Sequence, residues 1–367
     1  MTKYNSMMVS VPFAVQTCES LICETHRVTF EHPSESQFTP FEAEDPLGLR
    51  KAILPVFERM PDGRLIGMGT AVHLDGWGGC LTAEHVVNFL TAPLLEGGHN
   101  DESIMKADPS QHSHPVLLLG LGITFGSVAI PDWAFVSITD MQIIARKSDD
   151  PMAELQGRRS CEVAQDISFV QALFYPDVII PQVLPMQLSG WQPEIGEHVL
   201  AFGYPKLKPA EAMSDSEVRT IVEDGLHCAY GRITRLFPNG RDLTNPTPVF
   251  EVEANWPSGM SGGPVVNEQG NVVGIVSRSL APDGELSGFG YAACLAWIPE
   301  VSSLIPHLDK KNPGYRLGFA VLDDQEKLLG VWPTVELACD YASQDIKRKV
   351  FACSHRMGTD EYIGIDS

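Results

Sequence analysis

A serine flanked by glycines is the strongest chemical signal in the chain. The string GMSGGP occupies residues 259–264 and is followed by two valines. Glycines on both sides of a serine let the backbone turn sharply and expose its amide N–H groups. A nucleophile beside an oxyanion hole needs both features, so we expect Ser261 to be a nucleophile. A plain glycine-rich turn is the structural alternative.

A histidine and an aspartate earlier in the chain could complete an acyl-transfer site. His85 lies in the string TAEHVV, and an imidazole can act as a general base because it titrates near neutral pH. Asp132 begins the apolar string DWAFV, and a carboxylate entering a buried strand must find hydrogen bonds there. Taken alone, each fits a structural role better, His85 in a loop and Asp132 as a strand cap. Together with Ser261 they have the order of the triad in chymotrypsin-type barrels.

The elements that must position these residues are short strands. From about residue 50 to residue 300, apolar runs of β type alternate with glycine- and proline-rich turns. Such a series indicates a closed all-β barrel or a sandwich. We expect strands at residues 52–58, 65–74, 134–139, 197–202, 249–254, 272–277 and 290–294.

Three segments depart from this pattern. Residues 1–49 are poorly patterned and are interpreted as an N-terminal extension. Residues 140–180 look like an insertion into the segment at 50–305, and a helix is expected there at 152–166. Residues 306–367 predict a small α/β unit. Its expected elements are strands at 315–322 and 350–355 and an amphipathic helix at 334–349.

Composition excludes several classes of partner. The 367 residues are 44% hydrophobic and 20% charged, as in ordinary globular proteins. With 26 basic and 47 acidic residues, the net charge of −21 argues against nucleic acid and against anionic membranes. We see neither a secretory signal nor an apolar stretch of the ~20 residues that a membrane helix needs, and so expect a cytoplasmic protein. The eight cysteines form no CxxC pair, which favours free thiols over a zinc ribbon.

The strings TAEHVV, DWAFV and GMSGGPVV together resemble the three signatures of the trypsin-like serine peptidases. Between and after them, VLPMQLSGWQPEIGEHVL, GNVVGIVS and GFGYA resemble strands of the family's second barrel and specificity pocket. The resemblance covers about residues 50–305 and is greatest to the high-temperature-requirement branch, without an evident PDZ domain. It implies an all-β core of two packed six-stranded antiparallel barrels, chymotrypsin-like, with the active site in the cleft between them.

The resemblance also implies a role for each residue of the site. Ser261 would attack the scissile carbonyl, and His85 would take the serine proton and later give it to the leaving amine. Asp132 would hold His85 in the productive tautomer. The backbone N–H groups of Gly259 and Ser261 would form the oxyanion hole. The chemistry requires neither a metal nor a cofactor, and we expect none.

The expected substrate-binding residues are Asn255, Ser277, Arg278, Ser279 and Phe289. Asn255 stands where trypsin has an aspartate, so a charge-based preference for Lys or Arg is not supported. Ser277 would hydrogen-bond the buried aspartate of the triad, and residues 277–279 would pair with the substrate backbone. Phe289 would narrow the specificity pocket. Arg278 could attract an acidic side chain or could simply be solvated.

The sequence therefore predicts a serine endopeptidase that cleaves peptide bonds in protein or peptide substrates through an acyl-enzyme. A latent or pseudo-protease, which binds peptides until a partner activates it, is the alternative. An esterase on the same fold also stays open, because a fold does not fix a substrate. A regulatory partner could bind through residues 1–49, 140–180 or 306–367.

Overall fold

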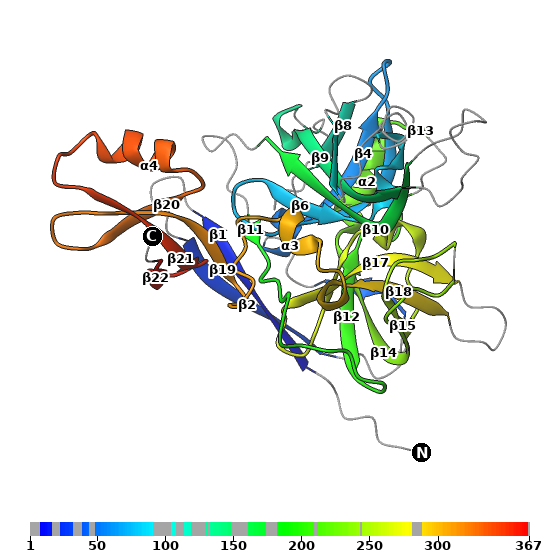
Figure 1. The fold of residues 1–367 in the computed structure, drawn as a ribbon. Coiled ribbons are helices and arrows are strands. Elements are labelled where there is room, and N and C mark those ends of the chain that lie inside the picture. Colours follow the sequence, from blue (N-terminus) through cyan, green and yellow to red (C-terminus); the bar gives the residue numbers. More distant parts are fainter. Residues whose placement is uncertain are drawn as a thin grey trace.

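The computed structural model is built mainly of antiparallel β-strands, as the sequence predicts (Figure 1). No helix among the residues described is long and apolar enough to cross a membrane. The structure describes residues 8–16, 23–31, 39–43, 48–90, 104–107, 114–118, 130, 132–147, 161–173, 182–207, 212–242, 244–280 and 288–365.

The first sheet closes into a six-stranded antiparallel barrel. Each strand pairs with the next in the ring β4-β5-β6-β10-β9-β8, and β8 returns to β4. Two short strands extend this sheet, β7 (Ile104–Ala107) beside β9 and β13 (Ala212–Met213) beside β5. The strands of the ring are β4 (Ile53–Arg59), β5 (Leu65–His73), β6 (Gly79–Thr82), β8 (His114–Leu118), β9 (Phe135–Lys147) and β10 (Cys161–Ala172).

The second sheet has the pairing order β12-β16-β17-β18-β15-β14, and β12 also pairs with β14. One set of its apolar residues, with Trp256 among the largest, forms a core of its own, whereas others, such as Phe202 and Ile275, share a core with the first sheet. A two-residue strand, β3 (Phe41–Glu42), adds to β14. The main strands are β12 (His198–Gly203), β14 (His227–Phe237), β15 (Val249–Glu253), β16 (Pro264–Val266), β17 (Val272–Leu280) and β18 (Phe289–Cys294).

The N-terminal extension contains regular structure that its sequence does not suggest. Strands β1 (Met8–Gln16) and β2 (Cys23–Glu31) pair along their whole length, and β1 also pairs with β11 (Gln182–Val183). Alternate residues such as Val9 and Phe30 are buried, because successive side chains of a strand point to opposite faces. The Phe30 ring packs edge-on against Phe202 of β12, at 5.3 Å between centroids. Contact with the second sheet thus stabilises a hairpin with a weak local pattern.

The predicted helix at residues 152–166 is wrong where it can be checked. Residues 161–166 belong to strand β10, whereas residues 151–160 lie outside the described part of the chain. Strand β10 pairs with β9 on one side and with β6 on the other, so the segment expected as an insertion contributes strands to the barrel itself. Cross-strand packing has overridden a weak helical pattern here.

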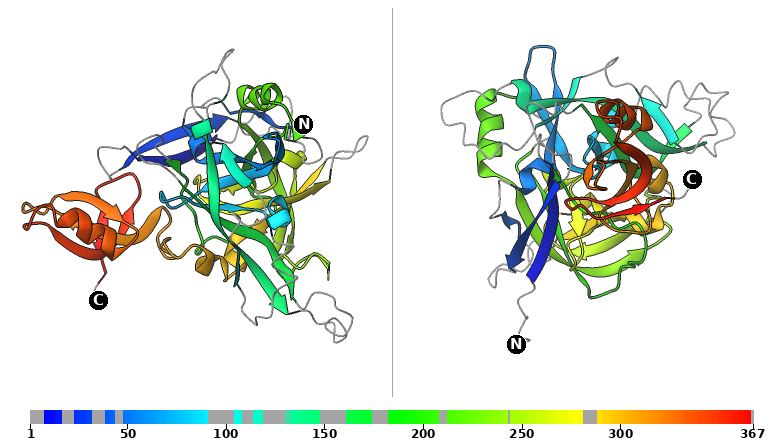
Figure 2. Two further views of the ribbon diagram at one scale, coloured as in Figure 1. Left: turned by 90° about the horizontal axis from the view of Figure 1, so that it is seen from above. Right: turned by 90° about the vertical axis from the view of Figure 1, so that its left-hand side faces the viewer.

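Residues 315–364 form a four-stranded sheet with one helix, which extends to one side of the first two sheets (Figure 2). The two strands expected there are present, but the helix is shorter than expected. It begins after Thr334, whose side chain caps the Leu337 N–H, and it ends at Ala342. These elements are β19 (Tyr315–Leu322), β20 (Leu328–Trp332), α4 (Val335–Ala342), β21 (Lys349–Arg356) and β22 (Tyr362–Gly364).

A buried arginine joins this sheet to the first barrel. Arg316 donates to the backbone carbonyl of Asp75 at 2.9 Å, and its guanidinium lies 4.2 Å from the Trp77 ring centre.

The other described helices are short: η1 (Leu49–Lys51), η2 (Glu84–Val86), η4 (Asp132–Ala134), α2 (Asp215–Asp224), η5 (Ser258–Met260), η6 (Leu295–Trp297) and α3 (Val301–Leu304).

Candidate active site

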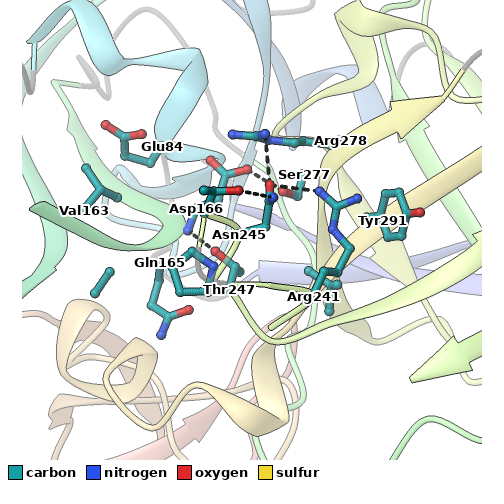
Figure 3. Close-up of a pocket in the computed structure, with 14 residues that line it drawn as sticks. Glu84, Val163, Gln165, Asp166, Arg241, Asn245, Thr247, Ser277, Arg278 and Tyr291 are labelled. Carbon is teal, nitrogen blue, oxygen red and sulfur yellow. Dashed lines mark hydrogen bonds between the residues drawn. The ribbon is translucent and has the colours of Figure 1, made fainter. Parts of the chain in front are cut away.

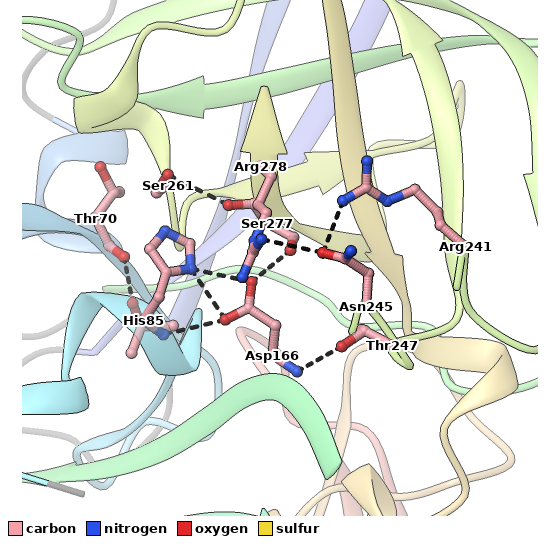
Figure 4. A network of polar contacts seen from close by, with 10 residues as sticks. Thr70, His85, Asp166, Arg241, Asn245, Thr247, Ser261, Ser277 and Arg278 are labelled. Atoms are coloured by element: carbon pink, nitrogen blue, oxygen red, sulfur yellow. Dashed lines mark hydrogen bonds and ion pairs between the residues drawn. The ribbon is translucent and has the colours of Figure 1, made fainter. Parts of the chain in front are cut away.

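His85 lies in the single helical turn η2, directly after barrel strand β6. Its Nδ1 is 3.0 Å from each carboxylate oxygen of Asp166, and its backbone N–H donates to Asp166 Oδ1 at 3.1 Å (Figure 4). About a third of the imidazole side chain is exposed. One edge of the ring is therefore fixed by a carboxylate, which sets the tautomer with the proton on Nδ1.

A bulge in strand β10 places Asp166. The pairing of β10 with β9 jumps from Val163 opposite Ala145 to Ser168 opposite Ile143, so four residues of β10 face one residue of β9. Within this bulge the backbone N–H of Asp166 donates to Thr247 Oγ1 at 2.8 Å and leaves the ladder. Bulges commonly re-aim a side chain in this way next to active sites.

Ser277, from strand β17, donates its hydroxyl to the second oxygen of Asp166. The sequence predicts that Ser277 bonds an aspartate that orients His85, and in the structure Ser277 bonds Asp166, the carboxylate that contacts His85. Its carboxylate therefore accepts from a side chain of the second sheet as well as from His85 of the first. Burial alone would raise the pKa of Asp166, but the hydrogen bonds and charge of His85, together with Ser277, hold that pKa below its usual value.

The prediction that Asp132 orients His85 is corrected by this geometry. Asp132 is exposed in η4 before strand β9, and it lines a different cavity with Arg59 and Val218. Strand β10 lies beside β6, the strand that leads to His85, with Ser168 opposite Thr82. The bulge that contains Asp166 lies opposite residues 143–145 of β9, whereas Asp132 lies before the first residue of that strand.

The sequence did contain a signal for Asp166. Residues 166–170 read DISFV, which has the same pattern as DWAFV at residues 132–136: aspartate, any residue, a small residue, then Phe-Val. Because a helix was expected at residues 152–166, the string DISFV was not interpreted as the start of a strand segment with a candidate aspartate. A strand interpretation of this segment would have left two candidate aspartates.

The pKa of His85 reflects two opposing effects. Burial of the ring disfavours the imidazolium, but the hydrogen bond to Asp166 and its negative charge outweigh burial and raise the pKa of His85 above its usual value. Two residues modulate it further: the positive charge of Arg278 lowers the pKa and the negative charge of Glu84 raises it. The imidazole is thus set to accept a proton and to hold it as imidazolium.

Ser261 follows the short helix η5, on the edge of His85 away from Asp166 (Figure 4). Its backbone carbonyl accepts from the Thr70 N–H of the first barrel at 2.8 Å, which fixes the loop across the two sheets. The Ser261 hydroxyl donates to the carbonyl of Ser277 at 3.4 Å. Among the described residues no hydrogen bond joins Ser261 to His85, and the serine hydroxyl faces the Ser277 carbonyl instead.

The glycines of the serine string are required by close backbone approach. A side chain on Gly259 would begin 2.1 Å from the Tyr204 carbonyl oxygen, and one on Gly263 would begin 1.9 Å from that of Phe202. Gly262 has a φ of +81° as well. The string therefore forms a tight turn pressed against both sheets, as the sequence suggests.

One of the two N–H groups expected in the oxyanion hole is already bonded. The N–H of Ser261 donates to the carbonyl of Ser258 at 3.1 Å, within the turn of η5. The carbonyl of Gly259 accepts from Thr70 Oγ1 at 2.8 Å. In this conformation the Ser258 carbonyl therefore occupies the hydrogen-bonding position in front of the Ser261 N–H.

The expected substrate-binding residues separate into two groups. Ser277 and Arg278 line a cavity beside Asp166 (Figure 3). Asn255, Ser279 and Phe289 do not line it. Ser279 pairs with Gly290 in β18, and Phe289 begins that strand. A side chain on Gly290 would begin 2.1 Å from the indole of buried Trp256, so Trp256, which the sequence analysis did not consider, packs against this part of β18.

Cysteines contribute no crosslink to the described part of the site. Cys80, Cys228, Cys294 and Cys353 are buried free thiols, and Cys339 is an exposed one. Burial raises the pKa of Cys294 to about 12, and that of Cys353 to about 11, which makes both thiols unreactive near neutral pH.

Comparison with known proteins agrees with this architecture. The family model for the trypsin-like peptidase domain matches residues 67–275, which is more than half of the chain. A solved structure with similarity is described as "Crystal structure of Rv3671c protease, inactive form", at 16% identity and a TM-score of 0.38, covering 70% of this chain and 88% of that chain. No curated protein matches the sequence. The chain belongs to the trypsin-like peptidase domain family.

Proposed function

We propose that the protein is a serine endopeptidase with a triad of His85, Asp166 and Ser261. The observation that carries the proposal is the contact of both Asp166 oxygens with His85 Nδ1, 3.0 Å each, beside a serine held in a glycine turn. A carboxylate in this position keeps the proton on Nδ1 and leaves Nε2 free to accept the serine proton.

The proposed reaction begins when the Ser261 hydroxyl turns from the Ser277 carbonyl toward His85 Nε2. His85 takes the hydroxyl proton as Ser261 Oγ attacks the carbonyl carbon of the peptide, and the carbonyl oxygen becomes an oxyanion. His85 then protonates the leaving amine, the C–N bond breaks and an acyl-enzyme remains. In the second half, His85 takes a proton from a water molecule as the water oxygen attacks the acyl carbon. His85 then returns the proton to Ser261 Oγ, the ester C–O bond breaks, and the carboxylic acid product leaves. Asp166 stabilises the imidazolium of His85 throughout without accepting its proton.

A fluorophosphonate probe tests this proposal, because it phosphonylates only an activated serine. We expect mass spectrometry to locate one adduct, on Ser261, in the wild-type protein. Ser261→Ala should lose the adduct completely, while Ser258→Ala, three residues earlier in the same turn, should keep it. Folded wild-type protein that stays unlabelled under all conditions would contradict the catalytic role.

The occupied N–H of Ser261 favours a second candidate, a latent form of the same peptidase. In the observed turn, the Ser258 carbonyl takes the hydrogen bond that an oxyanion would take. A form of this kind should label slowly and should accelerate when a peptide binds and rotates the Ser258–Gly259 peptide. Labelling that is fast and unaffected by added peptides would exclude latency and leave the simple peptidase.

The charges around His85 predict how the labelling rate depends on pH. The rate should fall as the pH drops through the pKa of His85, because the imidazolium cannot accept the serine proton. Glu84→Gln removes a negative charge that raises this pKa, so it should move the acid limb to lower pH. Arg278→Gln removes a positive charge that lowers it, so it should move the limb to higher pH. Shifts in the same direction would refute this electrostatic account.

A further inference from the structure

A cavity of about 140 Å³ opens beside Asp166, where Asn245 and Arg241 lie (Figure 3). Its walls come from the bulge of β10, from the segment that connects β14 with β15, and from β17 and β18. Liquid water occupies about 30 Å³ per molecule, so the space suits a side chain rather than one water molecule. Both sheets contribute to it, as they do to the triad.

Two arginines converge in this cavity. Arg241 Nη2 is 2.9 Å and Arg278 Nη1 is 3.0 Å from the same atom, Asn245 Oδ1 (Figures 3 and 4). The amide nitrogen of Asn245 donates to both oxygens of Asp242, which fixes the amide with its oxygen toward the arginines. Two cations therefore share one neutral acceptor.

Neither guanidinium forms an ion pair with a carboxylate in the described part of the chain, although the protein carries 47 acidic residues against 26 basic ones. The acidic groups nearby have other partners. Asp242 accepts from Thr244 and Asn245, and Asp166 accepts from His85 and Ser277.

Two more carboxylates complete this environment. Glu251 accepts from the Tyr291 hydroxyl and from Thr234, and its nearest cation is Arg235 at 3.6 Å. Glu84 lines the cavity at its edge toward His85 and is mostly buried. The two arginines thus keep a positive charge that no described carboxylate pairs with directly.

Arg241, in the segment that connects β14 with β15, has its guanidinium orientation fixed before any ligand binds. Its guanidinium lies 4.0 Å from the centre of the Tyr291 ring, and this stacking keeps the plane of Arg241 fixed. A fixed planar fork loses little freedom when it binds a carboxylate. Arg278 lies on the exposed end of β17, next to Ser277, so a peptide lying along this strand would pass both cations.

From this convergence we propose that the cavity binds an acidic side chain, Asp or Glu, of the peptide substrate, a few residues from the scissile bond. The carboxylate would bridge Arg241 and Arg278 and add charge-assisted hydrogen bonds to those that the neutral Asn245 oxygen accepts. This inference rests on the proposed peptidase function, since it makes the two arginines specificity residues of the same site.

The first test compares matched substrates. A peptide library cleaved by the wild-type protein should show enrichment of Asp or Glu at one position, and replacing that residue by Gln or Asn should lower kcat/KM by about tenfold or more. In Arg241→Gln/Arg278→Gln the acidic and amide substrates should be cleaved equally. Arg146→Gln, which removes an exposed arginine paired with Glu162, should keep the wild-type preference.

The second test does not depend on turnover. Ser261→Ala protein, folded but unable to react, selects binders from a random peptide library. Acidic enrichment that disappears when both arginines are replaced, and that weakens at high salt, would support the proposal. Binders without acidic enrichment, or no binders, would overturn it. Failure of the peptidase proposal would appear separately, as wild-type protein that the fluorophosphonate never labels.

Discussion

Asp166→Asn is expected to lower the rate of Ser261 acylation by about 10⁴-fold. The amide that replaces the carboxylate can present its N–H to His85 Nδ1, which then becomes the acceptor and moves the ring proton to Nε2. The imidazole keeps its place but can no longer accept the serine proton. The second-order rate constant of fluorophosphonate labelling measures the effect at a pH where His85 is neutral.

Asp132→Asn is the matched control, because it makes the same chemical change at the other DxxFV-type aspartate of the chain. Asp132 lines a separate cavity and contacts neither His85 nor Ser261 among the described residues, so labelling should stay within about twofold of wild type. The opposite pattern, with Asp132→Asn inactive and Asp166→Asn active, would refute the assignment of Asp166. Thermal unfolding of both variants separates loss of chemistry from loss of fold.

Gly262→Ala is expected to destabilise the protein by about 3 kcal/mol or more and to abolish labelling with it. The φ of +81° at Gly262 is costly for any residue with a Cβ. A Cβ there would also begin 2.1 Å from the Thr70 carbonyl oxygen and 2.2 Å from Thr82 Oγ1. Because backbone cannot yield as a flexible side chain can, the turn must move away from the first barrel. The free energy of unfolding in urea gives the magnitude.

Gly63→Ala separates the two causes. Gly63 has a similar φ of +87°, but nothing lies within 4 Å of the position that a Cβ would take. Only the conformational cost applies there, about 1–2 kcal/mol, and the site should label normally. Equal destabilisation by the two substitutions would show that the close approach at Gly262 contributes nothing.

The sequence by itself predicted the class of fold correctly, and it indicated His85 and Ser261 of the site that we propose. Apolar runs bounded by glycine- and proline-rich turns predicted seven strands of the two sheets, among them β4, β5 and β17. The string around Ser261 was informative by itself, since glycines on both sides of a serine let the backbone turn sharply. His85 followed from its string and its order relative to Ser261, and strand β19 was predicted to the residue.

The hairpin β1–β2 shows where such reasoning fails. Its local pattern is weak, and its stability depends on β11 and on Phe202, which are more than 150 residues away in the sequence. A strand that is stabilised by such distant partners need not have a strong β pattern in its own sequence.

Only the tertiary structure decided which aspartate serves His85. DWAFV and DISFV are equivalent as strings, and both begin or enter strands of the first barrel. The choice depends on two non-local features: β10 pairs with β6, and a bulge in β10 turns Asp166 out of the ladder toward His85. The same reason holds for Arg241 and Arg278. Strand pairing and one loop bring them to a single amide oxygen, and register between distant segments cannot be derived from local pattern.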